Sequence, residues 1–131
     1  MAENIFKSTN TTALAFIGDA VYEVSVRDHV MRSGVIRADG LHKAAVKYVR
    51  AESQARALKA LIEGLTEDET TLVKRARNRR ITSKPKNADP VDYKMATAFE
   101  ALIGALYMDG RSHRMEEIIQ LAISAIDSPT A

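Results

Sequence analysis

Residues 95–106 read MATAFEALIGAL, an apolar run that is interrupted by a single carboxylate, Glu100. A helix that is apolar on nearly every side is typical of one surrounded by protein. A second stretch of this kind, residues 13–22, reads ALAFIGDAVY and carries one carboxylate, Asp19. Each stretch also holds a glycine, Gly104 or Gly18. Glycine costs about 1 kcal/mol inside a helix, and close approach of two helix backbones is one reason to keep it there.

The two carboxylates need a partner if their helices are buried, because an isolated charged acid is unstable in apolar surroundings. No Lys or Arg lies three or four residues from Asp19, or within five residues of Glu100. Two acids that converge from neighbouring helices repel each other unless a divalent cation lies between them. Mg²⁺ suits such a site, because it is held by one or two carboxylates and keeps several waters. The alternative is that one acid reaches a distant Arg or the surface.

The rest of the chain predicts further helices around these two. Glycine and proline are scarce among the 131 residues, and the apolar spacing follows the helical period. Capping signals and breakers mark where the predicted helices begin and end. The first helix begins just after residues 8–10 and runs to about 31, and a later one begins at the capping box at 66–69 and continues into a basic stretch. The other predicted helices cover residues 39–48, 51–62, 90–108 and 112–126. We therefore predict an all-α helical bundle, a single domain over residues 1–131 with its core at about 8–126.

One apolar stripe in the first long helix predicts a packing face. Its members are Leu14, Ile17, Val21, Val24 and Met31. The spacing places them on one side of the helix, and Asp19 on the opposite side. Core and dimer interface both remain open for this stripe.

Composition excludes several classes of protein. Cysteine is absent, which excludes a disulfide scaffold, a cysteine-ligated zinc site and thiol catalysis. No apolar run approaches the roughly 18–20 residues of a membrane span, and the first ten residues lack the layout of a secretory signal. We therefore expect no membrane association and a cytoplasmic location.

The charges are unevenly distributed along the chain. Residues 74–86 hold seven of the nineteen Lys and Arg residues and no acid, so the remainder has twelve basic and seventeen acidic residues, a net charge of −5. We call residues 74–89 the basic segment; its part from 79 to 89 has no apolar period and is predicted to be a loop. Such a concentration of positive charge favours a polyanionic partner over a merely solvated surface segment.

Two motifs resemble those of a known family. Residues 16–21, FIGDAV, resemble the signature helix of the ribonuclease III family, and residues 99–105, FEALIGA, resemble its second acidic helix. They occur in the family's order, with the basic stretch between them. With Tyr22-Glu23 and Arg77-Asn78, the chain is similar to the Mini-ribonuclease III class over roughly residues 8–126. It ends where a full-length family enzyme would continue into a double-stranded-RNA-binding domain.

The resemblance implies a homodimeric endoribonuclease that cleaves double-stranded RNA. It implies dependence on Mg²⁺, with Mn²⁺ as a substitute, and products with a 5′-phosphate and a 3′-hydroxyl. Asp19 and Glu100 match the family's metal-binding and catalytic acids. The implied substrate is the bacterial precursor of the large-subunit (23S) ribosomal RNA, whose ends the class matures, and a ribosomal protein is a further candidate partner.

The basic segment is the candidate RNA-binding surface, because A-form RNA is recognised through its shape, its 2′-hydroxyls and its phosphates. Its candidate RNA-binding residues are Lys74, Arg75, Arg77, Asn78, Arg79, Arg80, Lys84 and Lys86.

The sequence departs from the ordinary family pattern at three acidic positions. Two glutamates upstream of the signature aspartate fall on Thr12 and Ala15, and an aspartate before the second-helix glutamate falls on Thr97. Mini-type members share this reduced set. It leaves open whether one metal or two act. It also leaves two alternatives, a related protein that binds RNA or ribosomal protein without cutting it, and a helical module whose basic segment binds an acidic protein.

Overall fold

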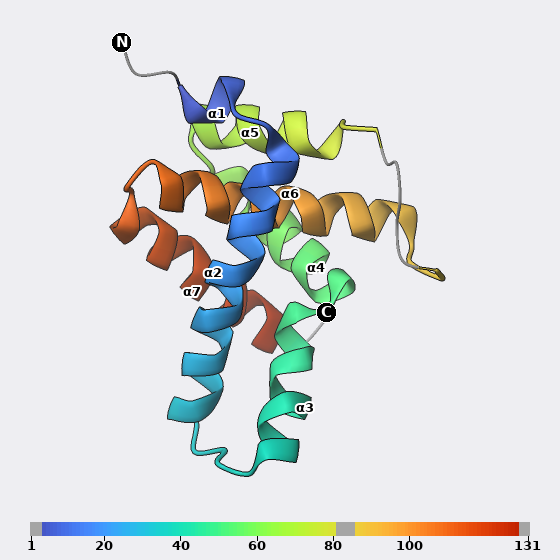
Figure 1. Ribbon diagram of the computed structural model, residues 1–131, viewed down its shortest axis with the longest axis vertical. Helices are drawn as coiled ribbons and strands as arrows, with labels where there is room; N and C mark the ends of the chain where they lie inside the picture. The colour runs from blue at the N-terminus through green and yellow to red at the C-terminus, as the bar shows by residue number, and fades with distance from the viewer. Residues whose placement is uncertain (1–3, 81–85, 129–131) are drawn as a thin grey trace.

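The computed structural model describes residues 4–80 and 86–128, and no β-strand occurs in either range. The predicted all-α class is confirmed. The helices, shown in Figure 1, are α1 (Ile5–Ser8), α2 (Thr11–Arg32), α3 (Ala38–Val49), α4 (Ala51–Leu61), the short 3₁₀ helix η1 (Ile62–Gly64), α5 (Glu67–Arg77), α6 (Pro90–Met108) and α7 (Ser112–Asp127). No helix within the described ranges is long and apolar enough to cross a bilayer.

Helix α6 lies at the centre of the molecule. It contacts α2, α4, α5 and α7, and α2 crosses it while the α2–α3 hairpin extends away from the other helices (Figure 1). Every residue from Ala101 to Leu106 is buried. The prediction that residues 95–106 form a helix surrounded by protein is therefore confirmed.

The starts of α2, α5 and α6 are set by side chains that satisfy free backbone N–H groups. Asn10 accepts a hydrogen bond from the Ala13 N–H at 3.1 Å and begins α2. The predicted capping box of Thr66 and Glu69 is present at α5. Asp89 caps α6, because its Oδ1 accepts from the Val91 N–H at 2.8 Å. These local signals explain why most predicted helix boundaries agree with the structure within one or two residues.

Helix α1 was not predicted, and the core begins earlier than residue 8. Phe6 is only 1% exposed and packs into the hydrophobic core. The Arg111 guanidinium lies over the Phe6 ring, 4.7 Å from its centroid. A four-residue helix is too short to show a periodic pattern, so only its packing against α5 reveals it.

The apolar stripe predicted on α2 does not form one continuous face. Leu14 is buried, whereas Val24 and Met31 are 69% and 64% exposed. The buried face instead consists of every fourth residue from Leu14 onward, namely Leu14, Gly18, Tyr22, Val26 and Val30. Phe16 is 83% exposed on the opposite side, so α2 has one apolar face in the core and another on the surface of this chain.

A buried ion pair connects α5 to α7. Glu69 is fully buried and accepts hydrogen bonds from Arg114, at 2.9 Å from Nε and 2.7 Å from Nη2. Burial acts to raise the pKa of Glu69, but the bonds from Arg114 and from the Thr66 backbone outweigh it and hold that pKa below its usual value. The carboxylate therefore stays charged, and it joins the first turn of α5 to the start of α7.

The C-terminal end of α7 is tied to α3. The Tyr48 hydroxyl and the Lys47 ammonium each donate a hydrogen bond to Asp127 Oδ1 at 2.7 Å. His29 of α2 stacks edge-on against the Tyr48 ring, with centroids 5.3 Å apart. These contacts hold the C-terminal end of α3 against the C-terminal end of α7.

Candidate functional site

The crossing of α2 and α6 brings two helix backbones into direct contact. A Cβ atom on Gly18 would collide with the Glu100 carbonyl oxygen, and one on Gly104 would collide with the Leu14 carbonyl oxygen. The two glycines therefore allow the backbones of α2 and α6 to approach closely, as the sequence suggested. Because the contact includes Glu100 itself and lies one residue before Asp19, it also places the two acids at the same crossing.

The two carboxylates interact with each other. Burial first, and then a hydrogen bond and the negative charge of Asp19, raise the pKa of Glu100 to about 8, while Gln54 opposes this shift as a hydrogen-bond donor. Asp19 is exposed, and Glu100 is only partly exposed. At neutral pH in the absence of a cation, the Glu100 carboxyl group therefore keeps its proton.

This pair fits a hard divalent cation. Converging carboxylates that retain a proton near pH 7 release it when a cation neutralises their repulsion. Mg²⁺ binds through one or two carboxylates and fills its other positions with water and phosphate oxygens. Over residues 4–80 and 86–128 no group of three or more His, Asp and Glu side chains could hold a metal ion, so a cation at this pair would take its other ligands from water or phosphate.

The three positions that carry acids in the ordinary family pattern supply no carboxylate here. Thr12 is exposed, and Ala15 is buried in the core. Thr97 is partly buried, and its hydroxyl donates a hydrogen bond to the Tyr93 carbonyl at 2.9 Å. The backbone of its own helix therefore engages the Thr97 side chain.

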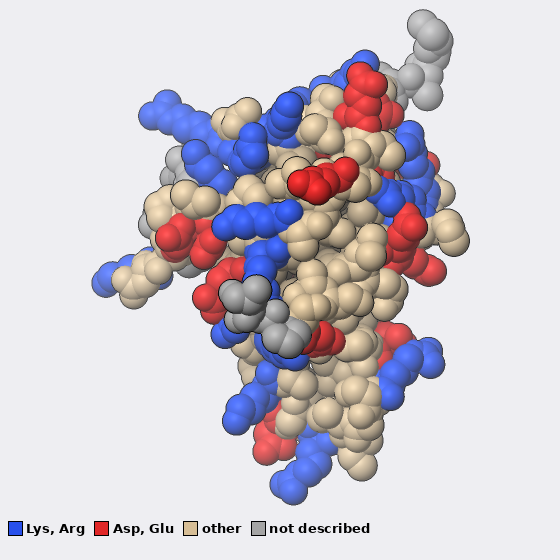
Figure 2. All heavy atoms as spheres, turned by 180° about the vertical axis from the view of Figure 1, so that it is seen from behind, with Lys and Arg blue, Asp and Glu red and all other residues tan. Residues whose placement is uncertain are grey.

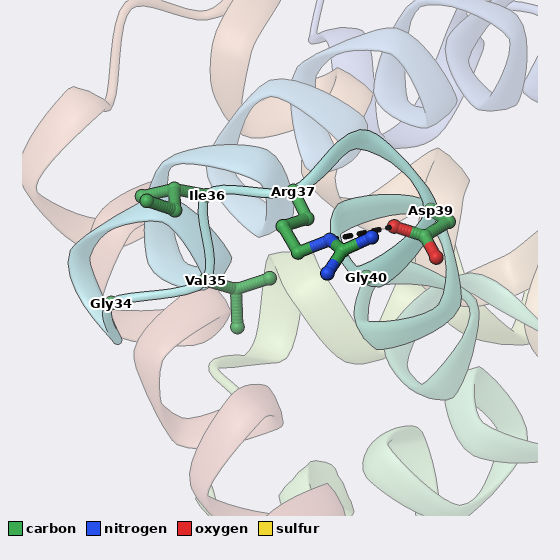
Figure 3. A pocket seen from close by; sticks show the side chains of 6 residues that line it. All are labelled: Gly34, Val35, Ile36, Arg37, Asp39 and Gly40. Atoms are coloured by element: carbon green, nitrogen blue, oxygen red, sulfur yellow. Dashed lines mark ion pairs between the residues drawn. The ribbon is translucent and has the colours of Figure 1, made fainter.

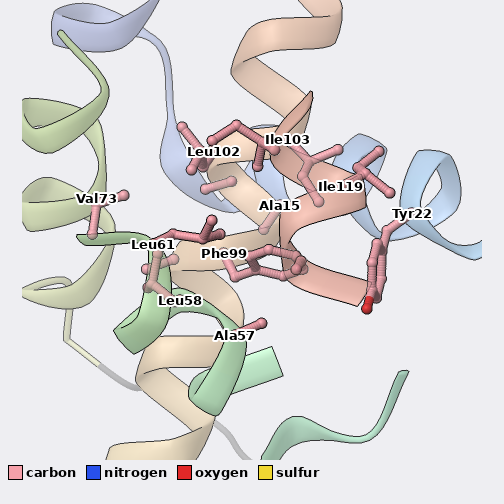
Figure 4. Close-up of a cluster of buried hydrophobic side chains, with 14 of the residues drawn as sticks. Ala15, Tyr22, Ala57, Leu58, Leu61, Val73, Phe99, Leu102, Ile103 and Ile119 are labelled. Atoms are coloured by element: carbon pink, nitrogen blue, oxygen red, sulfur yellow. The ribbon is translucent and has the colours of Figure 1, made fainter. Parts of the chain in front are cut away.

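Two neutral side chains, Tyr22 and Gln54, lie near Glu100. The sequence motifs did not single out Gln54. Tyr22 is fully buried edge-on against Phe99, with ring centroids 5.0 Å apart (Figure 4). Burial above all raises the pKa of Tyr22 far beyond its usual value, so it is a neutral packing residue. Gln54 of α4 is 2% exposed, and its position beside Glu100 comes from helix packing that no local pattern reveals.

The basic segment begins on α5 and continues beyond its end. Lys74, Asn78, Arg79, Arg80 and Lys86 are exposed. Figure 2 shows Lys and Arg side chains gathered on the upper left, which corresponds to the upper right of Figure 1, where α5 ends, because the two views differ by a half turn about the vertical axis. Arg77 is partly buried, and Lys84 lies outside the described residues.

Arg75 has a structural role that its place in the basic segment did not indicate. Its guanidinium donates hydrogen bonds to the carbonyl oxygens of Phe6 and Thr9, at 3.0 Å each from Nη2. These contacts satisfy carbonyls at the end of α1 and hold that helix on α5. Arg75 is therefore set apart from the exposed residues of the segment.

A hollow on the surface lies away from the two acids. It has a volume of about 520 Å³ and is lined by residues of the α2–α3 connection (Figure 3). Its charged groups, Arg37 and Asp39, face each other at 3.8 Å and are both exposed. An exposed ion pair of this kind offers no catalytic chemistry, so the candidate site remains the α2–α6 crossing.

Comparison with known proteins gives one consistent result. The sequence profile of the Ribonuclease III domain matches residues 12–111. A Mini-ribonuclease 3 of Brevibacillus brevis is 48% identical over 119 residues, which cover 91% of this chain and 89% of that protein. A Mini-ribonuclease 3 of Symbiobacterium thermophilum is 43% identical and covers 87% of this chain and 88% of its own. The crystal structure of a Fusobacterium nucleatum protein, 31% identical, has a TM-score of 0.83 and covers 93% of this chain and 98% of that one. The chain therefore belongs to the ribonuclease III family of endoribonucleases, in which Mini-ribonuclease 3 proteins are its relatives.

Proposed function

We propose that this endoribonuclease uses Mg²⁺, or Mn²⁺ in its place, to cleave double-stranded RNA, with Asp19 and Glu100 as the metal-binding catalytic acids. The observation that carries the proposal is the interaction of these two carboxylates at the α2–α6 crossing, where the pKa of Glu100 is raised to about 8. Bringing two acids together in a partly buried site is unfavourable by itself. A bound divalent cation would offset that repulsion.

Asp19 and Glu100 would have different roles at this site. The bound cation would act as a Lewis acid and activate water for attack on a phosphodiester. Asp19 is exposed and therefore accessible to a hydrated cation from solvent. Glu100 is held in a partly buried setting and must release its proton before it can serve as a ligand. Hydrolysis between phosphorus and O3′ leaves a 5′-phosphate and a 3′-hydroxyl.

The basic segment is the proposed RNA surface. Its exposed members carry positive charge without a neighbouring acid in residues 74–86, and the Arg side chains offer bidentate contacts to phosphate. Arg75 is left out of this surface because its guanidinium holds α1. The proposal therefore keeps Lys74, Arg77, Asn78, Arg79, Arg80 and Lys86, and Lys84 by sequence alone.

A homodimer is the proposed assembly, formed through the exposed apolar face of α2. Phe16, Val24 and Met31 are all more than 60% exposed on this face, and Ala20 lies between the first two. Apolar side chains at such spacing favour a second protein surface over water. A twofold dimer would give two equivalent sites, one for each strand of an RNA duplex.

The proposed substrate is the precursor of the large-subunit (23S) ribosomal RNA. The likeness to Mini-ribonuclease 3 proteins supports this substrate. A ribosomal protein bound to that RNA is a further candidate partner. The deciding experiment begins with a simpler substrate, because catalysis and choice of substrate are separate questions.

Cleavage of a long double-stranded RNA tests the proposed chemistry. Wild type should cut the RNA in Mg²⁺, whereas Asp19→Asn should lose activity by orders of magnitude, and a chelator should abolish it reversibly. A single-stranded RNA of the same length serves as the matched substrate control. Tight RNA binding without cleavage in either Mg²⁺ or Mn²⁺ would instead identify a non-catalytic RNA-binding protein.

A further inference from the structure

The last two carbonyl groups of α3 are satisfied by side chains from two other helices. The Tyr22 hydroxyl of α2 donates to the Tyr48 carbonyl at 3.0 Å. The Gln54 amide of α4 donates to the Val49 carbonyl through Nε2 at 2.8 Å. A helix end has four such carbonyls without a partner in the helix, so both bonds have a clear structural purpose.

Gln54 has a second contact that Tyr22 lacks. Its amide also lies beside the Glu100 carboxyl group, where it opposes the rise in the pKa of that group. An amide nitrogen carries two hydrogens, so the nitrogen that donates one to the Val49 carbonyl has a second available for the Glu100 side chain. Because the bond to Val49 fixes the amide in place, the position of Gln54 beside Glu100 is fixed as well.

The other end of the Gln54 amide is unpaired. Oε1 is buried and has no hydrogen-bond partner among the described residues, although the whole residue is only 2% exposed. Leaving a buried acceptor unpaired costs about 1–3 kcal/mol. Since α4 buries this group next to a carboxylate of the candidate site, a water molecule at the site can supply the missing donor.

We propose that Gln54 is a positioning residue of the Asp19–Glu100 site, which orients the Glu100 carboxylate through Nε2 and accepts a hydrogen bond at Oε1 from water held at that site. This inference rests on the proposed function and deepens it. Mg²⁺ keeps several of its waters when it is bound by few carboxylates, so a hydrated cation brings hydrogen-bond donors to the site.

A neutral amide suits this place better than a further acid. Positions 12, 15 and 97 provide no carboxylate, and two acids already repel each other at the crossing. An amide can orient one carboxylate and contact bound water without adding a third negative charge. Groups that orient metal ligands in this way typically change metal affinity or activity by about 10–100-fold when they are removed.

Binding of Mn²⁺ alone, measured by calorimetry on the full chain without RNA, tests this role. Gln54→Met keeps the volume of the side chain but removes its polar atoms. Tyr22→Phe is the matched control, because it also removes one bond to the end of α3 but leaves the Gln54 amide in place beside Glu100. We expect Gln54→Met to weaken Mn²⁺ binding by about tenfold or more, and Tyr22→Phe to stay within about twofold, since its bond lies outside the site. Thermal unfolding should show a similar loss of stability in both.

The outcomes separate the two proposals. If both variants change the Mn²⁺ affinity equally while Asp19→Asn loses binding, Gln54 is only structural and this inference is overturned. If wild type and Asp19→Asn bind Mn²⁺ equally, the proposed metal site itself is wrong. Should Gln54→Met fail to fold, Gln54→Asn replaces it. Its shorter amide cannot reach both Val49 and Glu100, so the Mn²⁺ affinity must fall if the inference holds.

Discussion

Glu100 is a carboxyl group whose protonation changes near physiological pH. Burial and the neighbouring Asp19 raise its pKa from 4.5 to about 8. At pH values between 4.5 and about 8, Glu100 of the metal-free folded chain holds a proton that the same side chain has released in the unfolded chain. The resulting contribution to stability is complete below about pH 4.5 and is lost as the pH rises through about 8. Stability of the metal-free protein should therefore fall over this range.

Glu100→Gln tests this at single-residue resolution. The amide cannot ionise, so the variant should have a higher Tm than wild type above pH 8, by about 10 °C or more, because a rise in pKa from 4.5 to about 8 corresponds to several kcal/mol. The two Tm values should converge near pH 4.5, where the wild-type side chain is also neutral. Calorimetric scans in chelator over this pH range provide the measurement. A Tm difference that is independent of pH would contradict the raised pKa.

The sequence identified Asp19 and Glu100 because an acid in an otherwise apolar helix is a strong local anomaly. It could not identify Gln54, since a glutamine in residues 51–61, AESQARALKAL, is ordinary for an amphipathic helix. Arg75 shows the reverse problem. Its charge placed it in the basic segment, but the nearby end of α1 binds its guanidinium.

At the scale of elements, the contact between α2 and α6 depends on two glycines. A methyl group at Gly18 or Gly104 would meet the backbone of the other helix, which cannot move aside as a flexible side chain can. We therefore expect Gly18→Ala and Gly104→Ala each to lower the free energy of unfolding by about 3 kcal/mol or more. Urea titration followed by circular dichroism measures the loss.

Gly64→Ala is the matched control for these two substitutions. No atom lies within 4 Å of the position that its Cβ would take, and its φ is not in the left-handed region. This variant should keep or slightly raise the stability of wild type. Equal effects at all three glycines would show that the backbones of α2 and α6 are not in contact.

The helices themselves were mostly predictable, because local signals begin and end them. Asp89 with Pro90, and Thr66 with Glu69, mark their helix starts in the sequence and make the expected capping bonds. Gly34 and Gly110 adopt positive φ at the predicted ends of α2 and α6. Helix α1 was missed, since a short segment gains its structure from the packing of Phe6 rather than from a pattern of its own.

At the scale of the whole molecule, the opposite charges of the basic segment and the remainder should determine RNA affinity. Changing Arg77, Arg79 and Lys86 together to Gln should weaken binding to double-stranded RNA. It should also reduce the slope of log affinity against log salt by about 2–3, because each lost phosphate contact removes slightly less than one unit. Filter binding at several salt concentrations measures both quantities.

A charge-matched variant separates local contact from net charge. Arg27, Arg32 and Arg37 are exposed, and each lies beside an acid within 4 Å on the α2–α3 hairpin. Changing these three to Gln should leave the salt slope near that of wild type. If it reduces the slope as much, the basic segment has no special place in RNA binding.

The exposed face of α2 predicts the assembly state. Phe16→Glu places a charge at the centre of the proposed dimer contact and should convert a particle of twice the chain mass of 14.4 kDa into a monomer. Leu121→Glu alters another partly exposed apolar residue, on α7, and should leave the mass unchanged. Sedimentation velocity distinguishes the two. A wild-type monomer at high concentration would contradict the proposed dimer.

By itself, the sequence determined the all-α class, most helix boundaries, the two acids and the concentration of positive charge, because capping, periodicity and composition are local properties. Only the tertiary structure decided which face of α2 is buried, that Arg75 binds carbonyl groups at the end of α1, and which side chain of α4 lies beside Glu100. These depend on how helices cross. The crossing angle and depth follow from packing between residues distant in sequence, so no single helix can specify them.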